Sequence, residues 1–116
     1  MTKQQVRRVP ERGDIYYVDL DPISGHEQSG FRPVLVVTQR LFNTCGTPIV
    51  CPITNAGTYA RNRGFAVTLH NTKTTGVVLC HQLRALDVDS RSGRYIEQLA
   101  TELMDEVLAR IAAVLE

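Results

Sequence analysis

The feature that most constrains the fold is one amphipathic stripe at the C-terminus, preceded by apolar runs that are all much shorter. From Ala100 onward, apolar residues recur at spacings of three and four, the period of a helix with one buried face. They are Ala100, Leu103, Met104, Val107, Leu108, Ile111, Val114 and Leu115. Thr101 is expected to cap this helix, with Glu102 and Asp105 near the positive end of its dipole. The remaining residues must form a surface that buries this one helical face.

The earlier apolar runs have the length and residue types of β-strands. The run "PVLVVT" is nearly continuous, which is typical of a strand buried on both faces. Predicted strands span residues 15–20, 33–38, 47–54, 65–70, 76–83 and a short 94–99, with one helical turn within 39–46 and a long polar connection at 55–64. Five or six short strands and one helix predict a mainly β fold, α+β by strict count. We expect a small barrel with the helix covering one side.

Length and composition indicate one globular domain. The chain has 116 residues, of which 43% are hydrophobic and 22% charged. Its apolar runs are all shorter than the roughly 20 residues that span a bilayer, so no membrane association is expected. The polar start of the chain has no apolar core of a secretory signal, which makes the cytoplasm the expected location. We expect residues 1–11 to be flexible and residues 12–116 to form the domain.

The cysteines give little support to a metal site. Cys45, Cys51 and Cys80 are an odd number without a CxxC pair, and Cys80 has only His81 beside it. Adjacent strand residues point to opposite faces, so these two would not share a metal. No metal or cofactor is therefore predicted, and the cysteines are expected to be buried reduced thiols.

Charge is distributed unevenly along the chain. Residues 101–116 contain four acidic side chains and one basic one, whereas residues 1–100 contain 12 basic and 8 acidic side chains. A mildly basic body of this kind favours a polyanionic partner.

The loop "GHEQSGFRP" (25–33) is rich in side chains that can do chemistry. His26, Glu27 and Arg32 lie in or beside a connection framed by two glycines. In a purely structural interpretation the glycines turn the chain, Glu27 and Arg32 form a surface ion pair, and His26 is solvated. In the alternative, the same side chains form a catalytic group.

Two further segments are candidates for nucleic-acid binding. Thr54 and Asn55 end a strand in "PITNAG", and Arg61 and Phe65 follow in the polar connection. Arginines can hold phosphates while aromatic rings stack bases, although a solvated charged loop with Phe65 in the core is the alternative interpretation.

In "CHQLRALD" (80–87), Gln82 and Arg84 would project together if the strand continues. A Gln and an Arg side by side at the end of an apolar strand are unusual in a core. An ion pair between Arg84 and Asp87 is the structural alternative.

Taken in order, these pieces resemble the MazF/PemK family of toxin ribonucleases, and most of all its PemK/Kid and ChpB branch. The resemblance rests on "ERGDIYYVDLDPISGHEQSGFRPVLVVT", "PITNAG", "ARNRGFAVTL", "TTGVVLCHQLRALD" and "ELMDEVLARIAAVL", and extends from Glu11 to the helix. "GHEQ" followed by "RP" is its most specific pattern.

The resemblance implies a fold and an activity. It implies an SH3-like barrel of five to seven short strands, a homodimer, and inhibition by a cognate antitoxin. The implied reaction is sequence-specific, metal-independent cleavage of single-stranded RNA, as in an mRNA interferase. The substrate's 2′-hydroxyl would attack the adjacent phosphorus and leave 2′,3′-cyclic phosphate and 5′-hydroxyl ends.

The resemblance also implies residue roles. Arg32 would hold the scissile phosphate, Thr54 would donate its hydroxyl to it, and Glu27 would act as base or orient Arg32. His26 and His81 are contingent members of the catalytic group, and which of these three residues is the base is left open. The implied RNA-binding residues are Gln28, Asn55, Arg61, Phe65, Gln82 and Arg84.

One departure from the branch concerns the strand after "TTG". The PemK/Kid branch has an Arg and an Asp there, proposed as acid and base, where this chain has Leu79 and His81. Leu79 cannot donate a proton, so we expect the acid role to pass to Arg32. Changed groove residues also make a changed cleavage sequence the expectation.

A function from another class remains as the alternative. Small barrels of the related CcdB type bind without catalysis and poison DNA gyrase. Such a binder has no need of "GHEQ" together with Arg32 and Thr54, and this pattern favours the ribonuclease interpretation.

Overall fold

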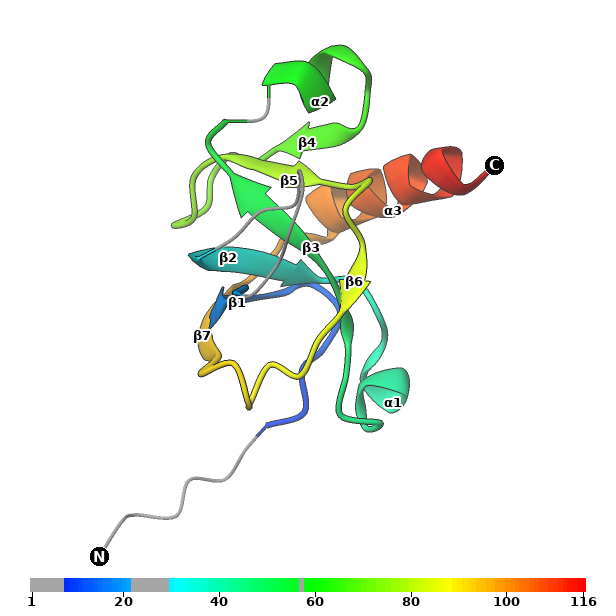
Figure 1. Cartoon of the computed structure of the whole chain (residues 1–116). Coiled ribbons are helices and arrows are strands. Elements are labelled where there is room, and N and C mark those ends of the chain that lie inside the picture. Colours follow the sequence, from blue (N-terminus) through cyan, green and yellow to red (C-terminus); the bar gives the residue numbers. More distant parts are fainter. Residues whose placement is uncertain (1–7, 22–29, 57) are drawn as a thin grey trace, which may run out of the picture.

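The computed structural model describes residues 8–21, 30–56 and 58–116 (Figure 1). Most of the described chain is short strands, and the one long helix is the last element. The strands are β1 (Asp14–Asp19), β2 (Phe31–Val36), β3 (Ile49–Thr54), β4 (Ala66–Thr68), β5 (Val77–Leu79), β6 (Arg84–Ala85) and β7 (Arg94–Gln98). The helices are α1 (Arg40–Asn43), α2 (Thr58–Asn62) and α3 (Thr101–Leu115).

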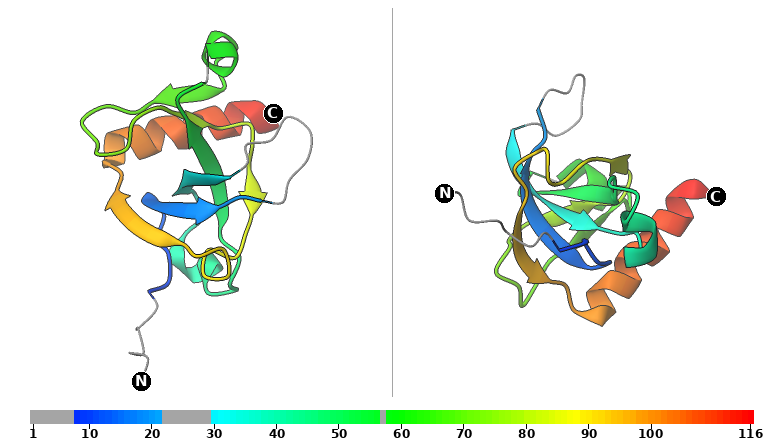
Figure 2. Two further views of the ribbon diagram at one scale, coloured as in Figure 1. Left: turned by 60° about the vertical axis from the view of Figure 1, so that its left-hand side comes forward. Right: turned by 90° about the horizontal axis from the view of Figure 1, so that it is seen from below.

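The strands form one antiparallel sheet that coils into a barrel-like shape without closing. Its order is β4-β5-β3-β2-β1-β7, and β6 pairs with the start of β3. The two views of Figure 2 show the strands curving around a common centre while α3 lies along one side. The mainly β barrel with a covering helix is therefore confirmed.

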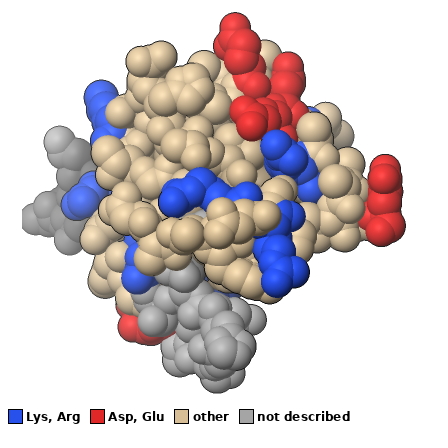
Figure 3. Space-filling model, turned by 90° about the horizontal axis from the view of Figure 1, so that it is seen from above, with Lys and Arg blue, Asp and Glu red and all other residues tan. Residues whose placement is uncertain are grey.

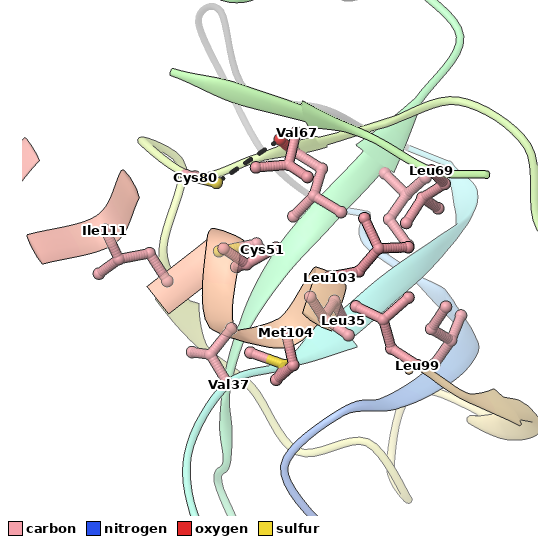
Figure 4. Close-up of a cluster of buried hydrophobic side chains, with 14 residues drawn as sticks. Leu35, Val37, Cys51, Val67, Leu69, Cys80, Leu99, Leu103, Met104 and Ile111 are labelled. Atoms are coloured by element: carbon pink, nitrogen blue, oxygen red, sulfur yellow. Dashed lines mark hydrogen bonds between the residues drawn. The ribbon is translucent and has the colours of Figure 1, made fainter. Parts of the chain in front are cut away.

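The core lies between the concave sheet and α3. Leu103, Met104 and Val107 are buried on the helix, and they belong to one cluster with Leu35 and Cys51 of the sheet (Figure 4). The predicted helical stripe is thus correct. Its predicted cap is wrong, because the N-cap is Ala100, which has no side-chain oxygen to offer.

The strand "PVLVVT" is buried on both faces, as predicted. Leu35 and Val37 belong to the cluster under α3, whereas Val34 and Val36 belong to a second cluster on the other face of the sheet. That second cluster contains Tyr16, Val18, Leu20, Val34, Val36, Val50, Leu86 and Val88. The two hydrophobic clusters hold the strand from both faces, and Arg32 lies near its N-terminal end.

Two predictions from the polar regions need correction. The connection 55–64 contains the helix α2, which packs Ala60 against Val77 and Leu79. The strand predicted at 76–83 ends at Leu79, where the Gln82 amide donates to the Leu79 carbonyl at 3.1 Å and turns the chain. The alternation expected beyond Leu79 therefore does not apply.

The cysteines differ in their surroundings. Cys51 and Cys80 are buried, and burial raises the pKa of the Cys80 thiol to about 11. Cys45 is exposed, so the prediction of a buried thiol is wrong for it. Among the residues that the structure describes, no cluster of three or more His, Cys, Asp or Glu side chains could hold a metal ion. No described helix is long and apolar enough to cross a membrane.

Candidate active site

Arg32 and Thr54 meet because β2 and β3 pair antiparallel. Val34 lies opposite Pro52 in this ladder, and continuing the register by two residues places Arg32 opposite Thr54. The side chains are in contact, with Arg32 Nη1 donating to Thr54 Oγ1 at 3.5 Å. Two residues that are 22 positions apart in the sequence are thus brought together at the end of two buried strands.

The Thr54 hydroxyl is oriented by two donors. Thr54 is 4% exposed, and its Oγ1 accepts from Arg32 Nη1 and from the Ala56 amide at 3.2 Å. A hydroxyl has two lone pairs and one proton. With both lone pairs engaged, the proton is the part that Thr54 can donate to an oxygen of a bound phosphate.

The backbone of Thr54 is fixed from the other side by Gly76. Thr54 pairs with Val77 of β5, and Gly76 approaches it with φ +122°. A Cβ at position 76 would lie 2.6 Å from the Thr54 carbonyl oxygen and 3.1 Å from Asn55 Oδ1. Only glycine fits both this conformation and this approach. Asn55 itself is exposed beside this contact.

Gly76 is a functional candidate that sequence reasoning missed. It follows "NTKTT", whose backbone is held by Glu97 of β7: the carboxylate accepts from the amides of Lys73 and Thr74 and from the Thr74 hydroxyl. No local pattern in the sequence marks Glu97, because its partners are more than 20 residues distant.

Phe65 and His81 form a second polar–aromatic group at the end of the β4–β5 pair. Their ring centroids are 5.1 Å apart with an interplanar angle of 35°. Phe65 also packs against the cluster of Ala60, Val77 and Leu79. Part of its side chain therefore belongs to the core, which was the alternative to a role in RNA binding. Partial burial lowers the pKa of the His81 imidazole below its ordinary value.

The remaining predicted RNA-binding residues lie on different elements. Arg61 is exposed on α2, where its guanidinium contacts Thr58 Oγ1 at 3.4 Å. Arg84 lies on β6 opposite Val50, and its Nη1 is buried without a hydrogen-bond partner among the described residues. Gln82 is partly buried in the turn after β5.

Three predicted residues cannot be placed. His26, Glu27 and Gln28 lie outside the described residues, and so does the alternative ion pair between Glu27 and Arg32. The described site therefore consists of Arg32 with Thr54 and Asn55, and of Phe65 with His81.

These groups lie at the end of the molecule that carries α2, β4 and β5. Viewed from above this end, Lys and Arg side chains lie across the middle of the surface and at its left, and most of the visible Asp and Glu side chains lie at the upper right and the right edge (Figure 3). A cation and a hydroxyl that converge within a basic surface are suited to a phosphodiester.

Comparison with known proteins identifies the class of protein that this fold and site define. Residues 11–115 match the family of PemK-like, MazF-like toxins of type II toxin–antitoxin systems, and the chain belongs to that family.

Individual relatives place it more closely. The chain is 46% identical over 120 residues to Endoribonuclease PemK of Escherichia coli, which covers 99% of this chain and 90% of PemK. It is also 46% identical over 109 residues to the Endoribonuclease toxin ChpB of Escherichia coli strain K12, covering 91% and 94% respectively. A crystal structure of MazE–MazF (Form II) from Deinococcus radiodurans superimposes with a TM-score of 0.79 at 32% identity, covering 94% of this chain and 97% of the other. The resemblance to the PemK and ChpB branch is confirmed.

The departure from that branch has a structural consequence. Leu79 is 3% exposed and packs in the cluster that holds α2, so its side chain is core. His81 lies past the end of β5 in contact with Phe65. Leu79 thus contributes to core packing, and His81 contributes a ring contact with Phe65.

Proposed function

We propose that this chain cleaves single-stranded RNA at specific sequences, without a metal, by attack of the substrate's own 2′-hydroxyl. It is an endoribonuclease toxin of a type II toxin–antitoxin system, as its family and its identity to PemK and ChpB establish. The observation that carries the proposed chemistry is the contact between the Arg32 guanidinium and the Thr54 hydroxyl.

The two side chains have complementary roles in this reaction. The planar guanidinium of Arg32 binds two phosphate oxygens and stabilises the negative charge that grows on them in the transition state. Thr54 donates its hydroxyl proton to the same phosphate. Leu79 cannot act as the acid, so Arg32 is also the proposed proton donor to the leaving 5′-oxygen. Glu27 serves as base or orients Arg32, with His26 as a further donor.

RNA binding extends beyond the scissile phosphate. Arg61 and Arg84 are proposed to contact phosphates, and Asn55, Gln82 and Gln28 to contact bases. DNA can occupy the same surface but lacks the nucleophile, so it is not cut.

The non-catalytic CcdB-like alternative is not favoured. The matching family is described as PemK-like and MazF-like, and the similar proteins are named endoribonucleases. A gyrase poison would also have no use for a buried threonine hydroxyl that accepts a hydrogen bond from an arginine.

We further propose the cellular setting. A family defined by toxin–antitoxin pairs implies a cognate antitoxin as protein partner, and we propose that the toxin itself is a homodimer. Residues 12–116 would act as the single toxin domain and residues 1–11 as a flexible segment. The proposed substrate, messenger RNA, places the activity in the cytoplasm.

The test is cleavage of a mixed-sequence single-stranded RNA in EDTA by the wild type and by Arg32→Ala, with analysis of the product ends. We expect 2′,3′-cyclic phosphate and 5′-hydroxyl ends from the wild type. The rate should fall by about 100- to 1000-fold in the variant, the usual cost of losing one transition-state donor. Circular dichroism checks that the variant folds. Intact RNA with a folded wild type would reject the proposed reaction, and undiminished cleavage by Arg32→Ala would reject its central residue.

A further inference from the structure

The contact between Phe65 and His81 is held by the pairing of β4 with β5. Phe65 precedes β4 and Cys80 follows β5, and the Cys80 amide donates to the Phe65 carbonyl at 2.8 Å. This bond continues the ladder by one step and brings the two rings to a centroid distance of 5.1 Å. The separation is within the range of offset aromatic pairs.

The two rings differ in burial. Phe65 is partly buried against Ala60, Val77 and Leu79, so three residues from α2 and β5 hold it in place. His81 is exposed. Phe65 is therefore the inner ring, held by these contacts, and His81 is the exposed outer ring.

The position of His81 relates it to Thr54. Val77 pairs with Thr54, and His81 follows Val77 by four residues, so the Cα atoms of Thr54 and His81 are at most about 20 Å apart. A nucleic acid with its phosphate at Thr54 can thus reach His81 with the base of a nearby nucleotide. Partial burial lowers the pKa of His81, which favours the neutral imidazole, and a neutral ring stacks without desolvating a charge.

We propose that His81, supported by Phe65, is a stacking platform for an unpaired base near the cleaved phosphodiester. This inference rests on the proposed function, since it assigns His81 to recognition of the RNA in place of proton transfer. Aromatic stacking accepts any base face, so the platform contributes affinity and positions the neighbouring nucleotide.

The two roles of His81 are separated by His81→Phe and His81→Ala. Phe keeps a stacking ring but cannot transfer a proton, whereas Ala removes both properties. The control is His70→Ala, which removes another exposed histidine beyond the opposite end of β4. None of these side chains is buried, so all three variants should fold.

Binding is measured by fluorescence anisotropy with a short mixed-sequence 2′-O-methyl RNA, which cannot be cleaved. We expect Kd to rise about 5- to 150-fold in His81→Ala, the range found for loss of one base–aromatic stack, and to stay near the wild-type value in His81→Phe and His70→Ala. In cleavage of unmodified RNA, His81→Phe should retain kcat, while His81→Ala should raise KM.

Three results would overturn the platform: equal binding by His81→Ala and the wild type, loss of kcat in His81→Phe, or no binding of the 2′-O-methyl RNA by the wild type. A wild type that binds this RNA but cleaves no unmodified RNA would reject the proposed function alone. Loss of kcat in His81→Phe, with an active wild type, would reject only the platform and return His81 to the role of base.

Discussion

At the scale of single residues, the site depends on a buried hydroxyl whose acceptor positions are occupied. Thr54 Oγ1 accepts from Arg32 and from the Ala56 amide, which leaves its proton available to donate. A neutral donor to a charged phosphate contributes more than an ordinary hydrogen bond, because charge-assisted bonds are the stronger class.

Replacement of this hydroxyl should therefore reduce the rate of cleavage. Thr54→Val keeps the shape but removes the donor, and we expect kcat to fall about 10- to 100-fold. Thr54→Ser keeps the donor and should stay within about threefold of the wild type. Single-turnover cleavage measures both rates. If the Val variant were as fast as the Ser variant, the hydroxyl would have no part in the reaction.

Gly76 offers a second test at this scale. An alanine there combines φ +122° with a Cβ that meets the Thr54 carbonyl, so Gly76→Ala should lower the free energy of unfolding by about 2–4 kcal/mol. Gly46 has φ +97° but no heavy atom within 4 Å of an added Cβ. Gly46→Ala should therefore cost only about 1–2 kcal/mol, as the matched control. Urea unfolding compares the two, and equal losses would mean that the approach to Thr54 adds nothing.

At the scale of elements, the connection between β4 and β5 is anchored by one carboxylate. Burial opposes ionisation of Glu97, but bonds from the Thr74 hydroxyl and the amides of Lys73 and Thr74 outweigh it and hold the pKa of Glu97 below its ordinary value. A carboxyl with a depressed pKa stabilises the fold when ionised. This contribution is complete above about pH 4.5, the unfolded value, and is lost as the pH falls through the lower folded value.

Glu97→Gln should accordingly lower the free energy of unfolding by about 1 kcal/mol near neutral pH, and the difference should shrink below about pH 4.5. Glu102→Gln is the control, because Glu102 is exposed on α3 beside the same loop and its carboxylate accepts no hydrogen bond from the described residues. Urea unfolding at several pH values tests both variants. A difference for Glu97→Gln that stayed constant down to pH 3 would contradict the anchoring role of the charge.

The elements also mark what sequence could predict. The stripe from Ala100 to Leu115 and the run "PVLVVT" predicted α3 and β2, because hydrophobic periodicity reports burial directly. The helix α2 was missed because only Ala60 of its five residues is buried, and a polar surface turn has no period. The end of β5 at Leu79 was missed because a backbone turn decides it.

The candidate site also contains features that the sequence could predict and features that it could not. Arg32 and Thr54 were identified from the family pattern, and only the ladder between β2 and β3 places them in contact. The ring contact of Phe65 with His81 depends on the pairing of β4 and β5, and Glu97 acts on a loop far away in the sequence. Residue types were therefore predictable, whereas partnerships set by long-range register were not.

At the scale of the whole molecule, binding of RNA should depend on where positive charge lies, more than on how much there is. The formal net charge is only +1, yet basic side chains gather over the end that carries α2 (Figure 3). Arg61 is exposed on α2, and Arg40 is exposed on α1 at the other end of the molecule (Figure 1). The variants Arg61→Gln and Arg40→Gln change the net charge equally.

Only the first variant should change the salt dependence of binding. For single strands, log K falls with log[salt] with a slope of about −0.7 per phosphate contact, so Arg61→Gln should reduce the slope by about 0.7 and Arg40→Gln should leave it unchanged. Anisotropy titrations of the 2′-O-methyl RNA at several salt concentrations give both slopes. Equal changes in the two variants would mean that RNA responds to net charge alone, and the surface around α2 would then have no special part in binding.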